Sequence, residues 1–183
     1  KNKYSLLKKS IDSLEEIKKL KVLIIGDAII DQYDTVRPLN KPLKENILAT
    51  RYIKSDIFLG GVFAAATNLS QFNNNVEICT VIGNDKDIKS KISKFSKKKK
   101  SKIFIEKNKV TVRKRRLVDV GYQKKISELY YMDDNLLGIS NLKRIKKFLN
   151  NHTNKYDVVI LIDYGHGFLN NEIYKILSKK SKY

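Results

Sequence analysis

Cysteine, proline, tryptophan and acidic residues are all scarce in this sequence. Its 183 residues include one Cys, two Pro and no Trp, and 19 Asp and Glu stand against 38 Lys and Arg. The single cysteine, Cys79, excludes an internal disulfide and favours a reducing, cytoplasmic setting. It lies in the apolar run 76–82, which favours a buried structural thiol over a reactive one. No apolar run approaches the roughly 18 residues that a membrane span needs, and no signal peptide is visible, so we expect no membrane partner.

The formal net charge of +19 is the strongest feature of the composition. One interpretation is nucleic-acid binding, because clustered cations release condensed counterions when they contact phosphates. The alternative is solvated lysines spread over helices and loops. Most lysines are spread along the chain and form no single stripe. The exception is the run 97–100 with Lys102, which is typical of a solvated loop. We therefore do not expect nucleic acid to be the partner.

Hydrophobic residues make up 42% of the chain, enough for a real core. Three short runs, 21–25, 76–82 and 158–162, are almost wholly apolar and predict strands buried on both faces. Helical patterns separate them, so the predicted fold class is α/β, with a mostly parallel sheet and helices on both faces. In residues 47–59 and 110–132, polar and apolar side chains alternate, and this pattern predicts a small flanking sheet. A helix is expected over 5–19.

Glycine and aspartate follow each of the three buried strands. Ligands of open α/β sheets bind beyond the carboxyl ends of the strands. Asp27 and Asp31 follow the first strand, where a pair of carboxylates can accept hydrogen bonds from the vicinal hydroxyls of a sugar. The alternative is that Asp27 caps a following helix and Asp31 is solvated. Asp163 follows the third strand, in a glycine-rich turn that ends at Gly167.

Gly60 and Gly61 precede an alanine-rich helical stretch, where they permit close backbone approach and offer free amides at a helix N-terminus. Tight packing of the helix on the sheet is an equally simple explanation of the alanines.

Lys114 and Arg116 share one face of an alternating strand and can meet one anionic group, although a plain surface strand shows the same pattern. Their neighbours Arg113 and Arg115 are expected to be solvated on the other face. No Walker loop, nucleophile elbow or CxxC motif is present, and His166 stands without the Cys or carboxylate cluster that a metal site needs.

These motifs, in this order over residues 21–169, resemble the ribokinase-like (PfkB-type) carbohydrate kinases, and in particular the branch that contains the heptose-phosphate kinase half of ADP-heptose synthase. The resemblance rests on VLIIGDAIIDQY (22–33), PLNKPLKENILATRY (38–52), FLGGVFAAATNLS (58–70), TVIGND (80–85), TVRKRR (111–116), ELYYMDDN (128–135) and VVILIDYGHGFL (158–169).

The resemblance implies an N-terminal helix over 1–20 and an incomplete ribokinase-like domain over 21–183, with a β lid formed by about 43–58 and 103–133. It implies that the sugar hydroxyls are gripped by Asp27, Asp31, Gly60 and Gly61. Asn68 matches an asparagine of the heptose-kinase branch. Lys114 and Arg116 match lid positions suited to a phosphorylated sugar, and Asp163 and Gly167 would line the acceptor site.

The chain departs from the family at Ala64, where the family has Asn, and at His166, where the variant motif has Lys. No Gly-x-Gly-Asp turn follows Gly167, so the catalytic base and the anion hole of the family are absent from this sequence. We expect the sugar-binding portion of a kinase whose intact form uses ATP and Mg²⁺. This portion would hold no catalytic residue or metal site, would bind neither cofactor well, and would be inactive alone. The alternative is a non-catalytic module that dimerises through the lid.

Overall fold

The computed structural model describes residues 2–39, 46–133 and 137–180. Its main sheet has four parallel strands in the order β5-β4-β1-β8. The strands are β1 (Val22–Gly26), β4 (Val76–Ile82), β5 (Lys100–Ile105) and β8 (Val158–Ile162). The three apolar runs of the sequence are thus neighbours in one sheet. β1 is buried along its whole length, as predicted, but the prediction that 158–162 is buried on both faces is wrong, since Val158 and Leu161 are 37% and 38% exposed.

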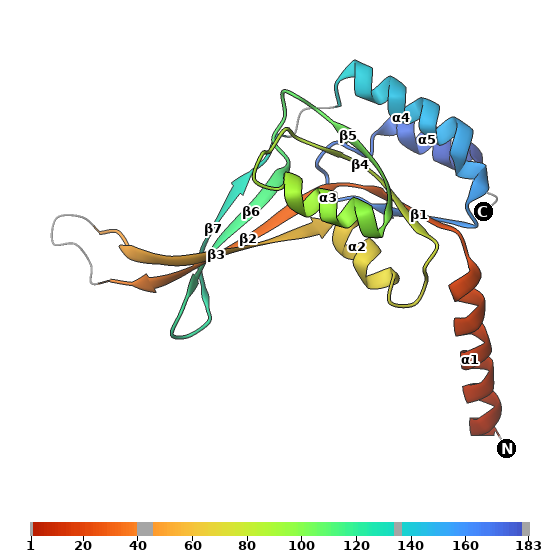
Figure 1. The fold of residues 1–183 in the computed structure, drawn as a ribbon, viewed down its shortest axis with the longest axis horizontal. Helices are drawn as coiled ribbons and strands as arrows, with labels where there is room; N and C mark the ends of the chain where they lie inside the picture. The colour runs from red at the N-terminus through yellow and green to blue at the C-terminus, as the bar shows by residue number, and fades with distance from the viewer. Residues whose placement is uncertain (1, 40–45, 134–136, 181–183) are drawn as a thin grey trace.

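Helices cover both faces of this sheet (Figure 1). Val22 and Ile24 of β1 pack in one core with α2 (Val62–Leu69) and α3 (Lys89–Lys98). Leu23 and Ile25 pack in a second core with α4 (Ile139–His152) and α5 (Asn171–Lys180). A short 3-10 turn, Thr153–Lys155, follows α4. The predicted α/β class with a mostly parallel sheet is therefore confirmed.

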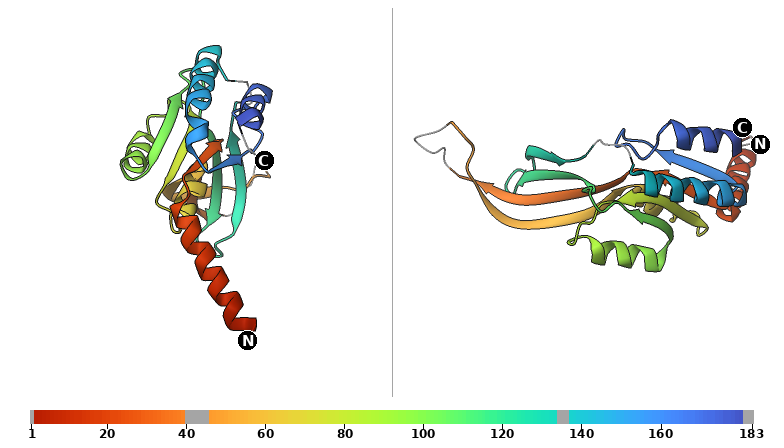
Figure 2. Two further views of the ribbon diagram at one scale, coloured as in Figure 1. Left: turned by 90° about the vertical axis from the view of Figure 1, so that its right-hand side faces the viewer. Right: turned by 90° about the horizontal axis from the view of Figure 1, so that it is seen from above.

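A second four-stranded sheet, here called the lid, extends away from the main sheet (Figure 2). Its order is β3-β2-β6-β7, formed by β2 (Ala28–Pro38), β3 (Thr50–Gly61), β6 (Val112–Asp119) and β7 (Lys125–Tyr131). The central pair β2 and β6 is parallel, and both outer pairs are antiparallel. Because β1 and β2 are separated by Asp27 alone, the chain passes directly from the main sheet into the lid.

The lid differs from the sequence prediction in two ways. Residues 103–105 belong to β5 and pair with β4, so they lie in the main sheet. Residues 28–38 follow Asp27 and include Asp31, and they were expected to lie at the rim or to begin a helix, but they form a central lid strand instead. Asp27 therefore caps no helix, and Asp31 lies within a strand. The part of the expected lid at 43–45 lies outside the described residues.

The expected N-terminal helix is present as α1 (Asn2–Lys19), and it projects from the rest of the chain (Figure 1). Buried Asn73 holds its C-terminal end, since its side-chain amide donates to the carbonyl oxygens of Ile17 at 2.6 Å and Leu20 at 2.8 Å. Within the described part of the chain, no helix is long and apolar enough to cross a membrane.

Candidate functional site

Asp27 fixes the loop that follows β8. Its carboxylate is 3% exposed and accepts hydrogen bonds from the backbone N–H groups of Tyr164 (2.8 Å), His166 (3.3 Å) and Phe168 (3.4 Å). A buried carboxylate that is hydrogen-bonded in this way is satisfied by the backbone. Asp27 therefore positions loop 163–168. It also lines a small cavity together with Thr111, His166 and Phe168, so its role as a sugar ligand stays a prediction.

The glycine pair lies against the same junction. Gly61 has a φ of +59°, and a Cβ there would meet the carbonyl oxygen of Asp27 at 2.2 Å. The N–H of Val62, the first residue of α2, donates to that oxygen at 3.0 Å. The start of α2, the end of β1 and loop 163–168 thus meet around Asp27. Only glycine fits at position 61, because both the backbone conformation and the space exclude a side chain.

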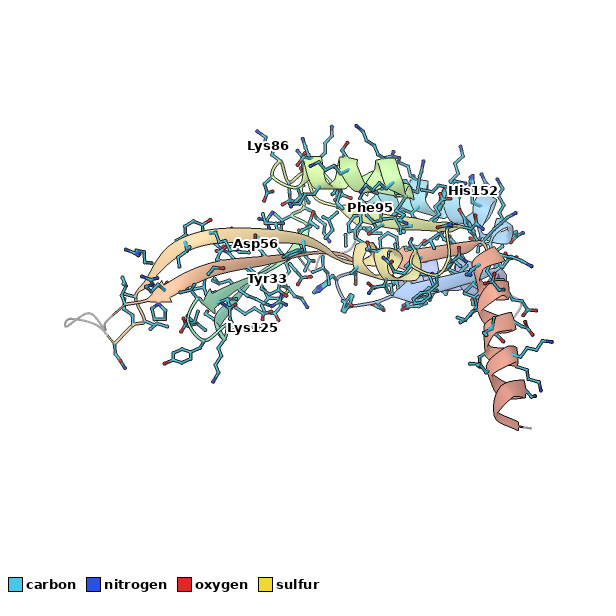
Figure 3. The ribbon with its side chains drawn as sticks, turned by 60° about the horizontal axis from the view of Figure 1, so that its bottom comes forward. Tyr33, Asp56, Lys86, Phe95, Lys125 and His152 are labelled. Atoms are coloured by element: carbon cyan, nitrogen blue, oxygen red, sulfur yellow. The ribbon has the colours of Figure 1, made fainter. Side chains whose placement is uncertain are left out.

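Asp31 and Arg116 form the centre of the site on one face of the lid, here called the inner face. The guanidinium of Arg116 lies 2.6 Å from Oδ1 of Asp31 and 3.2 Å from Oε2 of Glu128. It also stands over the ring of Tyr33, at 5.2 Å from the ring centre, and Figure 3 shows Tyr33 on the lid. Burial alone would lower the pKa of Arg116, but the hydrogen bond to Asp31 and the negative groups around it raise the pKa above its ordinary value. The site therefore holds a permanent, oriented cation.

Gly60 borders Asp31 on the neighbouring strand. A Cβ at position 60 would lie 2.3 Å from Oδ2 of Asp31, so the absence of a side chain leaves room for that oxygen. Oδ1 is engaged by Arg116, and Oδ2 lies beside the glycine. The structure thus brings Asp31, Gly60 and Arg116 together from three lid strands.

Lys114 joins the lid to the rim of the main sheet. Its Nζ atom lies 5.5 Å from the ring centre of Tyr130 and 5.7 Å from that of Tyr164. Tyr164 belongs to the loop that Asp27 holds, so the two sheets meet at this lysine. Among the residues that the structure describes, no carboxylate pairs with Lys114. Its charge is accordingly less neutralised than that of Arg116.

Two predicted site residues are not drawn into this cluster. Asn68 lies exposed in the last turn of α2, and none of the contacts described at the rim includes its side chain. The carboxylate of Asp163 accepts from the hydroxyl of Tyr174 at 2.6 Å and from the N–H of Gly165 at 2.8 Å. The hydrogen bond from Tyr174, followed by that from Gly165, lowers the pKa of Asp163. Asp163 is therefore tied to α5, while Gly167, with a φ of +84°, lies in the loop that Asp27 fixes.

The opposite, outer face of the lid carries a polar network. Arg113 pairs with Asp87 at 2.7 Å and donates to Gln32 at 3.0 Å, while Arg115 donates to Asp34 at 2.5 Å. The side chain of Asp34 is 1% exposed. The prediction that Arg113 and Arg115 are solvated on the other face is confirmed in part: Arg115 is 38% exposed while it pairs with buried Asp34, whereas Arg113 is only 17% exposed because it pairs with Asp87 and donates to buried Gln32.

A cavity of about 330 Å³ also lies on the outer face. It is lined by Gln32, Asp85, Val110, Thr111, Arg113, Arg115 and Tyr131. Thr111 is buried there, and its hydroxyl donates to Asp85 at 2.5 Å and accepts from the N–H of Gly83 at 2.9 Å. The beginning of β6 is thereby tied to the end of β4.

No protein-family model matches this chain. Among curated proteins, it is 29% identical over 164 residues to the bifunctional protein HldE of Aliarcobacter butzleri, a match that covers 85% of this chain and 33% of that protein. It is 28% identical over 171 residues to the bifunctional protein HldE of Campylobacter jejuni strain RM1221, with 90% and 34% covered. The chain thus spans about a third of the length of the curated relatives it matches.

Solved structures give the fold. A ribokinase from Giardia lamblia superposes with a TM-score of 0.62 at 12% identity, covering 88% of this chain and 51% of that one. A carbohydrate kinase from Agrobacterium tumefaciens superposes with a TM-score of 0.53 at 19% identity, covering 78% and 45%. The fold is ribokinase-like. The matched part corresponds to about half of each neighbour.

Sequence reasoning did not assign Tyr33, Glu128, Tyr130 and Tyr164 to the candidate site. Glu128 pairs with Arg116 across the β6–β7 ladder, and Lys114 is opposite Tyr130. Their alternation along 128–130 was visible in the sequence, but the register that sets them against 114 and 116 depends on the turn between the strands. Tyr164 reaches Lys114 only through the folding of loop 163–168 onto Asp27.

Proposed function

We propose that this chain is the N-terminal, sugar-binding portion of an ATP-dependent carbohydrate kinase and that its substrate is a phosphorylated sugar. The observation that carries the proposal is the meeting of Asp31, Arg116 and Lys114 beside Gly60, at the carboxyl edge of the parallel sheet. The similarity to HldE proteins and the ribokinase-like fold support the same class.

Asp31 is the proposed ligand of the sugar hydroxyls. Arg116 takes Oδ1 and fixes the carboxylate in one orientation, and Oδ2 lies at the bare backbone of Gly60. An oriented carboxylate accepts hydrogen bonds from hydroxyls with little loss of side-chain entropy, because the ion pair has already paid most of that cost.

Lys114 is the proposed ligand of the sugar's phosphate. Two tyrosine rings hold its ammonium group, and cation–π contacts of this kind leave the charge available to an anion. Arg116 is committed to Asp31 and Glu128, so we assign it to positioning Asp31 and not to direct phosphate binding.

Among the described residues, no group of three or more His, Cys, Asp or Glu gathers that could hold a metal ion by protein side chains alone. The sequence after Gly167 also lacks the Gly-x-Gly-Asp turn. We therefore derive no catalytic step within this chain. In the intact kinase, ATP would supply the phosphoryl group and Mg²⁺ would neutralise its charge, and both would depend on residues outside this portion.

Isothermal titration of the chain with sugars and their phosphates tests this function. Pentose, hexose and heptose monophosphates should bind saturably, and the unphosphorylated sugars should bind about tenfold or more weakly, as expected for the loss of one charge-assisted contact. Lys114→Met should remove this preference. Lys102→Met is the matched control, because Nζ of Lys102 also lies over an aromatic ring, that of Phe104 at 5.6 Å, but on β5 of the main sheet. Equal losses in both variants would contradict the assignment.

A second candidate function is that of a non-catalytic module whose lid pairs with another lid. Large apolar side chains of the lid are 45–58% exposed, among them Tyr52, Phe58, Leu129, Tyr130 and Tyr131. Light scattering tests this candidate: Leu129→Ser should abolish a lid-mediated dimer and leave sugar binding intact, whereas a strict monomer counts against it.

A further inference from the structure

The apolar face of α1 is uncovered. Leu7, Ile11 and Leu14 follow one another at helical spacing of four and three residues, which places them in one stripe. Their exposed fractions are 59%, 51% and 48%, and Ile17 beside the stripe is 38% exposed. Every α1 side chain whose exposure is described is exposed. The apolar stripe of an amphipathic helix normally packs against another part of the protein or against a partner.

The attachment of α1 keeps this stripe away from the chain's own core. Asn73 binds the carbonyl oxygens of Ile17 and Leu20, and Leu20 packs against the core. From that point the helix runs outward (Figure 2, left, and Figure 3). An 18-residue helix whose described apolar side chains stay exposed is marginal in water, because propensity alone barely offsets the cost of nucleation.

The charges beside the stripe indicate which partner fits. Lys8 and Glu15 are seven residues apart, so they lie on the same flank of the stripe. If two α1 helices pack antiparallel with Ile11 of each against Leu14 of the other, Lys8 of one copy lies within about 3 Å along the axis of Glu15 of the second copy, given the 1.5 Å rise per residue. The two-fold axis repeats this attraction on the second copy.

We propose that α1 is a dimerisation helix that packs antiparallel against α1 of a second copy of this chain. In this register Ile11 and Leu14 of each copy form the centre of the interface, Leu7 of each lies opposite Lys18 of the other, and Lys8 of each faces Glu15 of the other. In a parallel pair, the flank of one helix that carries Lys8 and Glu15 would lie against the flank of the second helix that carries Ser10 and Ile17. Neither Ser10 nor Ile17 carries a charge, so this arrangement would give Lys8 and Glu15 no oppositely charged partner there. This inference is independent of the proposed sugar-binding function.

Glu15 already contacts Lys18 on its own helix. That pair is exposed, with 54% and 58% of the two side chains accessible, and an exposed pair of this kind contributes little. It leaves the carboxylate able to meet a second cation. The net charge of +19 repels two copies, so association should strengthen as salt increases toward physiological ionic strength.

Sedimentation equilibrium of the full chain, with any affinity tag at the C-terminus, tests the pairing and its direction. The wild-type chain should show a concentration-dependent dimer. Lys8→Glu and Glu15→Lys each convert both attractive contacts into repulsive ones, and each should raise the dimer dissociation constant about tenfold or more. The double variant Lys8→Glu with Glu15→Lys restores opposite charges and should return the constant to within about threefold of wild type. Circular dichroism confirms that the exposed substitutions leave the fold intact.

Three outcomes overturn the proposal. The first is a monomer at every concentration. The second is a dimer whose dissociation constant in both single variants equals that of the wild-type chain. The third is a dimer that Leu129→Ser abolishes while Ile11→Ser does not affect it, because this result would place the interface on the lid.

Discussion

Asp27 offers the sharpest test of how the rim is held together. The perturbation is Asp27→Asn, which preserves shape and replaces one carboxylate oxygen by an NH₂ group. Tyr164 and His166 both donate to Oδ2, and Phe168 donates to Oδ1. The amide oxygen can serve only one of these two positions, so at least one backbone N–H must face another donor.

The expected loss follows from these distances. The 2.8 Å bond from Tyr164 is a full charge-assisted hydrogen bond, and the bonds of 3.3 and 3.4 Å are weaker. Hydrogen bonds to charged groups contribute about 1.5–3 kcal/mol each, and an orphaned buried donor costs about 1–3 kcal/mol. We expect Asp27→Asn to lower the free energy of unfolding by about 2 kcal/mol, and Asp27→Ala by roughly 3–5 kcal/mol.

Urea unfolding followed by far-UV circular dichroism measures this loss, and hydrogen exchange of residues 163–168 locates it. Asp163→Asn is the control, since that carboxylate is exposed and should change stability by less than about 1 kcal/mol. If Asp27→Asn were as stable as wild type and loop 163–168 exchanged no faster, Asp27 would not be the residue that positions the loop.

Three further predictions concern the lid and the core. Burial opposes ionisation of Asp34, but hydrogen bonds from Ser55, Gln32 and Arg115 outweigh it and lower its pKa. Its contribution is therefore complete above the unfolded pKa of about 3.9 and is lost as pH falls through the folded value, so urea midpoints should drop more steeply below about pH 4 in wild type than in Asp34→Asn. Gly60→Ala should weaken binding of sugar phosphates about tenfold or more in calorimetric titration, because the new methyl group would lie 2.3 Å from Oδ2 of Asp31; an unchanged affinity would remove Asp31 from the site. Burial raises the pKa of Cys79, so a thiol reagent should modify the native chain only at the rate of unfolding, and rapid labelling without denaturant would show that the core is open there.

Strands β1, β4 and β8 of the main sheet could be predicted from the sequence because they are runs of mostly apolar residues, whereas β5, which alternates lysine and serine with apolar residues, was expected in part in the lid. Local composition specifies such strands, and Gly-Asp at their ends marks the rim. The burial of Cys79 in β4 is confirmed for the same reason. The existence of α1 also follows from its periodicity, whereas its direction depends on Asn73, which lies more than fifty residues away.

Strand β2 could not be predicted in the same way. It carries Gln32 and Asp34 where a simple pattern requires apolar residues, and both are buried. They are tolerated because Arg113 and Arg115, 81 residues further along the chain, neutralise or hydrogen-bond them. Asp31 looked like a residue of a rim loop for the same reason, since its partner Arg116 is 85 residues away. This part of the fold depends on pairs of polar side chains that are far apart in the sequence, and local sequence patterns do not reveal such pairs.

The proposed sugar site can be seen in a crystal structure of this chain soaked with a sugar monophosphate. We expect the sugar hydroxyls to contact Asp31 beside Gly60 and the phosphate to lie within hydrogen-bonding distance of Nζ of Lys114. A ligand bound instead in the outer-face cavity beside Arg113 and Arg115, with the inner face empty, would contradict this expectation.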